Sequence, residues 1–188
     1  MAIDYRTVTS LEEVAQILDL QAHNLSTAIT PETALTQGFL TVRHDLDILW
    51  RMNQVEPSII AKFENKVIGY ALVMLPGFAH DIPVLQPMFD LIDQLAIADI
   101  NQGKQANWFV MGQVCVDEKF RGMGVFDGLY QKMTEVYRNK FDFAITEVAA
   151  RNTRSLRAHQ RVGFKDIHQY SETITGETWH LIMLHFKH

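Results

Sequence analysis

The sequence predicts an α+β fold, with a mixed and largely antiparallel sheet of about seven strands flanked by helices. Three observations lead to it: hairpin-like strands near both ends of the chain, a strand-helix-strand-helix order in its middle, and one nearly unbroken apolar run, WFVMGQVCV at 108–116. A strand covered on both faces has that unbroken character, so this run is expected to be central. A chain that begins and ends in hairpin-like strands fits a mixed sheet better than a doubly wound one.

The chain of 188 residues suits a single domain, 1–188. After a strand at 5–9, the segment SLEE places Ser10 three residues before Glu13. This capping box predicts a helix to about Leu20. Farther on, Pro31 favours a short second helix, because proline suits the first helical turn.

The next segments alternate between helix and strand signals. Residues 45–53, DLDILWRMN, predict a third helix, and 58–75, SIIAKFENKVIGYALVML, predict two strands around the polar turn at 64–66. A stretch of about 77–106 then interrupts the pattern as an insertion. Within it, apolar residues recur at helical spacing after Pro87, which predicts an inserted helix.

The strand at 108–116 is followed by a glycine-bearing turn and an apolar, helix-like segment that runs to about Asn139. FAITEVAA, at 143–150, predicts the next strand. A helix from Asn152 to Val162 and two closing strands complete the chain, around HQYSE and WHLIML.

Composition excludes several classes of protein. The net charge of -5 leaves no basic excess for a nucleic-acid backbone, and no stretch is long and apolar enough for a membrane span. The first residues, MAIDYRTVTS, lack the apolar core behind a basic lead that is typical of a secretory leader, so we expect a cytoplasmic protein. The chain has one cysteine, Cys115, which agrees with a reducing compartment. The histidines lack the close spacing of a metal site, so we predict no metal. A homodimer through the last strands stays open.

The turn FRGMGVFDGLY, 120–130, has the character of an anion site. The first amides of a helix lack partners within it, and the helix dipole makes that end positive. Gly122 and Gly124 remove side chains that would keep a ligand from those amides, and Arg121 adds positive charge. The turn therefore indicates a phosphorylated cofactor, unless the glycines only shape a tight turn. Neither a Walker loop nor a Rossmann fingerprint fits the spacing.

A second motif follows at 150–164, ARNTRSLRAHQRVGF. Asn152 is a good helix cap, and the helix it opens ends at Gly163. Arg-x-x-Gly at Arg121 and Gly124, together with Asn-x-x-Ser-x-x-x-His-x-x-x-Gly-Phe from Asn152, resembles the two signature motifs of the GNAT acetyltransferase superfamily.

The resemblance implies that the fourth and fifth strands splay apart and hold acetyl-CoA between them. The pantetheine arm would pair with the strand backbone of Val114, Cys115 and Val116. The pyrophosphate would lie near Arg121 on the amides of Gly122, Met123, Gly124, Val125, Phe126 and Asp127. Asn152 and Ser155 would lie beside the arm. Phe126 departs from the family, which usually has Gly or Ala there.

The resemblance also implies an N-acetyltransferase that passes the acetyl group directly to a primary amine of a small molecule or peptide. The Val116 N–H would stabilise the oxyanion. His159 stands where the family often has a Tyr that protonates the leaving sulfur. An imidazolium at this position could protonate the sulfur in the same way. Alternatively, His159 only packs beside the cofactor. Glu147 could deprotonate the amine, or be a solvated carboxylate. Cys115 is expected to be a buried hydrophobe rather than a nucleophile.

Residues 22–53 and the insertion 77–106 are expected to select the acceptor. Asp90, Asp93 and Asp99 in the insertion could attract a cation, or simply be solvated. Two alternatives stay open: a module that binds acyl-CoA without turnover, and an unrelated α+β protein that binds neither.

Overall fold

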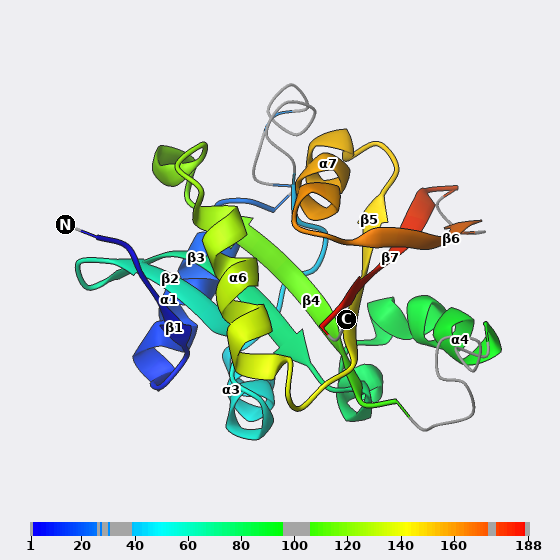
Figure 1. Ribbon diagram of the computed structural model, residues 1–188, viewed down its shortest axis with the longest axis horizontal. Coiled ribbons are helices and arrows are strands. Elements are labelled where there is room, and N and C mark those ends of the chain that lie inside the picture. Colours follow the sequence, from blue (N-terminus) through cyan, green and yellow to red (C-terminus); the bar gives the residue numbers. More distant parts are fainter. Residues whose placement is uncertain are drawn as a thin grey trace.

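The computed structural model describes residues 2–25, 27, 30, 39–95, 106–172 and 176–186. In this part of the chain, seven strands form one sheet in the order β1-β2-β3-β4-β5-β7-β6 (Figure 1). Every neighbouring pair is antiparallel except β4 and β5, which are parallel. The predicted mixed, largely antiparallel sheet is confirmed.

The elements follow the predicted order. The strands are β1 Asp4–Thr7, β2 Ile59–Phe63, β3 Lys66–Met74, β4 Trp108–Val116, β5 Phe143–Ala149, β6 Lys165–Ser171 and β7 Thr178–His185. The helices are α1 Leu11–Ala22, α3 Leu46–Val55, α4 Gln86–Gln94, α6 Val125–Tyr137 and α7 Thr153–Arg161, with short 3-10 turns at η1 Pro76–Asp81, η2 Pro83–Leu85 and η3 Glu118–Phe120. The helix predicted near Pro31 lies outside the described residues.

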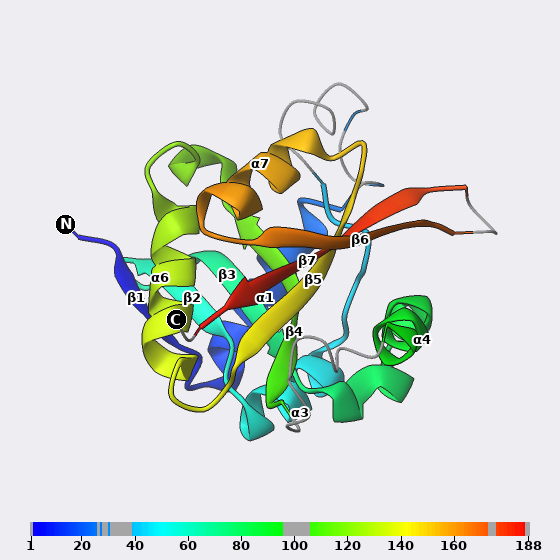
Figure 2. The same ribbon diagram turned by 45° about the vertical axis from the view of Figure 1, so that its right-hand side comes forward.

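Helices cover both faces of the sheet. Figures 1 and 2 show α6 across one face, with α1 and α3 behind the other. Each face has its own apolar core: α6 packs on the side of Phe109, and α1 on the side of Tyr70. None of the described helices is long and apolar enough to cross a membrane.

The parallel pair β4 and β5 separates after three residue pairs, Trp108 with Phe143 to Val110 with Ile145. The β3–β4 register slips by one residue between Ala71 and Val73, so β4 carries a bulge at the point where it leaves β5. A bulge bends the strand and reverses which side chains face which side. In Figure 1 the two strands start side by side and diverge toward α7. The predicted splay between the fourth and fifth strands is confirmed.

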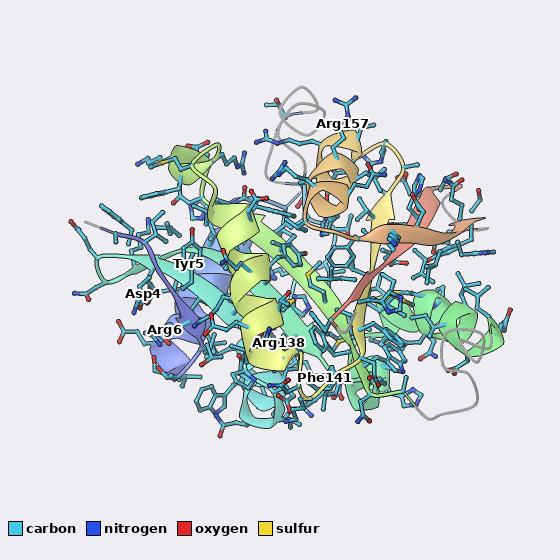
Figure 3. The ribbon with its side chains drawn as sticks, viewed as in Figure 1. Asp4, Tyr5, Arg6, Arg138, Phe141 and Arg157 are labelled. Carbon is cyan, nitrogen blue, oxygen red and sulfur yellow. The ribbon has the colours of Figure 1, made fainter. Side chains whose placement is uncertain are left out.

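Gly128 of α6 lets β1 approach that helix closely. Figure 3 labels Tyr5, the residue of β1 that makes this approach. A Cβ added there would lie 2.6 Å from the Tyr5 hydroxyl oxygen and closer still to the ring carbons. We expect Gly128→Ala to lower the free energy of unfolding by about 1–2 kcal/mol, because overpacking outweighs the helix-propensity gain of about 1 kcal/mol. Urea unfolding of the parent protein and the Gly128→Ala variant measures this change in the free energy of unfolding.

The Tyr5→Ala background is the matched control for this prediction. With the ring gone, Gly128→Ala should become neutral or stabilising, since only the propensity gain remains. Equal stability of the Gly128→Ala variant and the parent protein would show that the contact is not tight.

Candidate active site

A cavity of about 440 Å³ opens where β4 and β5 separate. Its walls are the end of β4, the glycine turn with the first turn of α6, and one face of α7. The predicted cofactor residues that line it are Val114, Cys115, Val116, Arg121, Gly122, Gly124, Val125, Phe126, Asp127, Asn152 and Ser155. Met123 does not line it and is 61% exposed. The two sequence motifs thus meet at one cavity.

The backbone of β4 presents polar groups to this cavity. The N–H of Asp117 donates to the carbonyl of Ile68 on β3 at 2.8 Å. Because antiparallel strands alternate the direction of their backbone groups, those of Val114 and Val116 point away from β3, toward the gap. The carbonyl of Val116 accepts from Arg121 Nε there, at 3.1 Å.

The glycine turn leaves open space over the start of α6. Gly122 and Gly124 have φ of 78° and 79°, in the left-handed region that favours glycine. A Cβ added to either would meet nothing within 4 Å. Gly124 is the N-cap residue of α6 and supplies no side-chain cap. The helix start therefore faces the cavity with bare backbone, which suits an anion.

Arginine side chains make this cavity positive although the whole chain is acidic. Arg121 donates from Nη2 to Asn24 Oδ1 at 2.6 Å, and Arg154 lines the same cavity. Burial, and secondly the nearby Arg121 cation, lower the pKa of Arg154. Arg161 also lines the cavity and pairs with Asp127 through two bonds of 2.9 and 3.0 Å. Positive charge gathered in a cleft favours a polyanionic ligand.

Phe126 does not close the helix start. Its ring packs against Tyr130 and edge-on against His159, with centroid distances of 4.9 and 5.2 Å. The ring is therefore held within an aromatic cluster between α6 and α7. These contacts hold a bulky residue at a position where the family that the motif resembles usually has a small one.

His159 is buried, with 1% of its surface exposed. Its Nδ1 lies 2.8 Å from the carbonyl of Ser155, so Nδ1 carries a hydrogen and Nε2 accepts from the Tyr130 hydroxyl at 2.9 Å. Burial lowers the pKa of His159 to about 4, and the hydrogen bond that His159 donates to the Ser155 carbonyl offsets this only in part. The ring is thus neutral at pH 7, with both nitrogens engaged. These surroundings argue against the predicted role as a charged proton donor, because a neutral ring holds its remaining proton tightly.

A smaller cavity of about 90 Å³ adjoins the first and shares part of its lining, including Leu40, Asn152 and Ser155. Glu147 of β5 lines it and accepts a hydrogen bond from the Tyr170 hydroxyl. Burial raises the pKa of Glu147 to about 7; the Tyr170 hydrogen bond lowers it in part, and the charge of Glu172 raises it. A carboxylate with that pKa can accept a proton near neutral pH.

Cys115 lies in the larger cavity as a buried free thiol. Burial raises its pKa to about 12, more than the nearby Arg121 charge lowers it. Since only a thiolate is a strong nucleophile, the protonated thiol of Cys115 is unreactive at pH 7.

Several lining residues were not predicted from the sequence. On α7, Arg154, Ala158 and Arg161 share a helix face with Ser155, and helical spacing from the motif would have found them. Helical spacing from the motif does not point to the other lining residues, which are Asn24, Phe39, Leu40 and Phe120.

Comparisons with known proteins agree with this geometry. The sequence model described as the acetyltransferase (GNAT) family matches residues 21–164, which is more than half of the chain. None of the curated protein sequences matches.

Solved structures share the fold at low identity. A chain of the NatC complex bound to Gag peptide and CoA has a TM-score of 0.66 at 14% identity, covering 98% of this chain and 99% of that one. The ribosomal-protein-S18-alanine N-acetyltransferase from Escherichia coli has 0.63 at 10%, covering 100% and 96%. The protein yncA from Salmonella typhimurium, solved with acetyl-CoA, has 0.63 at 14%, covering 99% and 95%.

The family match spans both sequence motifs, and the shared fold covers nearly the whole chain. The splayed β4–β5 pair and the glycine turn at the start of α6 lie within the matched residues. This chain belongs to the acetyltransferase (GNAT) family.

Proposed function

We propose that the protein is an N-acetyltransferase that moves the acetyl group of acetyl-CoA to a primary amine by direct attack on the thioester. One observation carries the proposal: two cavities meet at the β4–β5 gap, the larger with arginines and bare backbone, the smaller with the carboxylate of Glu147. The structural relatives that were solved with CoA or acetyl-CoA support the choice of cosubstrate.

The larger cavity would hold acetyl-CoA. The open backbone at Gly122 and Gly124, beside Arg121 and Arg154, suits the diphosphate. The outward backbone groups of Val114 and Val116 suit the amide-bearing pantetheine arm, with Asn152 and Ser155 across the gap. When bound, this group supplies an activated acyl thioester.

The chain's own groups would then handle charge and protons. Glu147 would take the proton of the incoming ammonium, a role worth about 100-fold to 10,000-fold in rate. The N–H of Val116 would stabilise the oxyanion, worth about 100-fold or more. The quiet thiol of Cys115 favours direct transfer over an acyl-enzyme. His159 would act as a positioning residue that fixes Ser155 and the start of α7.

A second candidate, a module that binds acyl-CoA without turnover, is favoured by the neutral His159, which offers no charged donor to the leaving sulfur. We rank it second because a thiol has a pKa of about 8.5, so a thiolate can leave near neutral pH without a strong acid.

Two measurements on the full chain separate these readings. CoA at about 100 times its dissociation constant should raise the Tm by about 5–10 °C. An amine panel with acetyl-CoA, followed by product mass and thiol release, should then give acetylated amine. A Tm shift with no product from any amine would support the binding module, whereas no Tm shift would remove both proposals.

A further inference from the structure

We propose that the acceptor is a monoamine that carries a compact branched aliphatic group and no neighbouring carboxylate, and that Leu85 and Met88 of the segment at 76–94 impose this choice. The inference rests on the proposed function and adds the substrate class. It follows from the shape, lining and charge of the smaller cavity beside Glu147.

Apolar side chains line more of the smaller cavity than polar ones do, although Gln113, Thr146 and Asn152 also line it. Leu85 and Met88 reach it from η2 and α4, and both are buried in the same core cluster as Val110 of β4. Trp179 of β7 and Val148 of β5 also line it. An apolar group that packs against these side chains loses part of its contact with water, which is favourable in proportion to the area buried.

The charged groups that line the cavity suit a substrate with a single ammonium group and no carboxylate. Glu147 is its one acidic lining residue, and no Lys or Arg is among the lining residues that the structure describes. A polyamine would bury additional cations without partners, and a free amino acid would bring a carboxylate with no cation to meet it. The predicted aspartates do not change this. Asp90 and Asp93 are exposed and do not line the cavity, and Asp90 accepts a hydrogen bond from Gln86 Nε2 at 2.7 Å. Asp99 lies outside the described residues.

The size of the cavity limits the apolar group. About 90 Å³ holds roughly three or four heavy atoms, whereas a cavity known to bind benzene has about 150 Å³. The wall opposite the sheet is anchored, because Gln113 Nε2 donates to the carbonyl of Val42 at 2.8 Å and Asn152 Nδ2 donates to that of Phe39 at 3.5 Å. A branched aliphatic group fits this space and an aromatic ring does not.

The test compares kcat/KM for five amines with acetyl-CoA: isobutylamine, leucinamide, leucine, spermidine and phenethylamine. We expect isobutylamine and leucinamide to exceed the other three by about tenfold or more. A higher value for leucinamide would point to a peptide N-terminus as the source of the amine, and a higher value for isobutylamine to a free amine. The same order should appear in Tm shifts of the CoA-bound protein, which need no turnover.

Met88→Ala should enlarge the cavity and improve phenethylamine relative to isobutylamine about tenfold or more. Phe89→Ala is the matched control, because Phe89 is the next residue of α4 and is buried against Trp108 but does not line the cavity. Phe89→Ala should leave the ratio of kcat/KM for phenethylamine to kcat/KM for isobutylamine unchanged. Leu85→Ala gives a second enlargement if Met88→Ala folds poorly.

Efficient acetylation of spermidine or leucine in preference to isobutylamine would overturn this inference and leave the proposed function intact. An equal change of the ratio in Met88→Ala and Phe89→Ala would overturn the role of the segment at 76–94. A protein that neither binds CoA nor acetylates any amine would overturn both proposals together.

Discussion

Replacing Glu147 by Gln is expected to lower kcat/KM for amines by about 100-fold or more and to make the folded protein more stable at pH 8. The loss of activity follows because Gln cannot accept a proton from the ammonium. The gain in stability follows because Glu147 is ionised in a buried place. Steady-state kinetics and thermal unfolding of the same preparations measure both effects.

The pH dependence separates the two roles of Glu147. In the parent protein, kcat/KM should rise as the pH increases through about 7, because the base must be ionised. Burial raises the folded pKa above the ordinary value of 4.5, so the protonated side chain favours folding at low pH and this contribution is lost as the pH rises toward 7. Glu147→Gln should therefore raise the Tm by about 2–8 °C at pH 8 and hardly at pH 4.5.

Tyr170→Phe is the matched control for this carboxylate. The Tyr170 hydroxyl donates to Glu147 and lowers its pKa in part, so removing it should move the rising limb of the pH profile to higher pH while activity persists. An unshifted profile, or a Glu147→Gln variant as active as the parent, would mean that Glu147 is not the base.

Gly124→Ala is expected to weaken CoA binding by about tenfold or more and to destabilise the protein by about 1–2 kcal/mol. The stability loss comes from placing a side chain at φ 79°. The binding loss comes from a methyl group in the open space over the start of α6, where a phosphate would approach the amides. Calorimetric titration with CoA gives the dissociation constant.

Gly176→Ala provides the control for backbone strain. Gly176 has a similar φ of 68°, also with open space about its Cβ, but it precedes β7 and does not line either cavity. It should lose similar stability and keep its affinity for CoA. If both variants bind CoA like the parent, the glycine turn is not the phosphate site.

Much of the fold was predictable because its signals are local. The β2–β3 hairpin around Asn65, the run that became β4, and the cap at Asn152 each depend on neighbouring residues. The splay of β4 from β5 came instead from the family resemblance. No local pattern marks the bulge that accompanies it, because a bulge depends on pairing with a distant strand.

Most of the predicted site residues line the two cavities, but their protonation was not predictable from the sequence. His159 is neutral because Tyr130, 29 residues earlier, and the surrounding rings bury it. The pairing of Arg121 with Asn24 joins residues 97 apart, and sequence spacing carries no sign of it. Such contacts are set by tertiary packing, and they decide which of the predicted residues can move a proton.

A crystal structure of the full chain with CoA tests the central claim most directly. We expect the pantetheine arm in the gap between β4 and β5, its amides paired with the backbone of Val114 or Val116, and the diphosphate on the amides that follow Gly122 and Gly124. Coenzyme bound elsewhere, or a gap closed by the Phe126 ring, would contradict it.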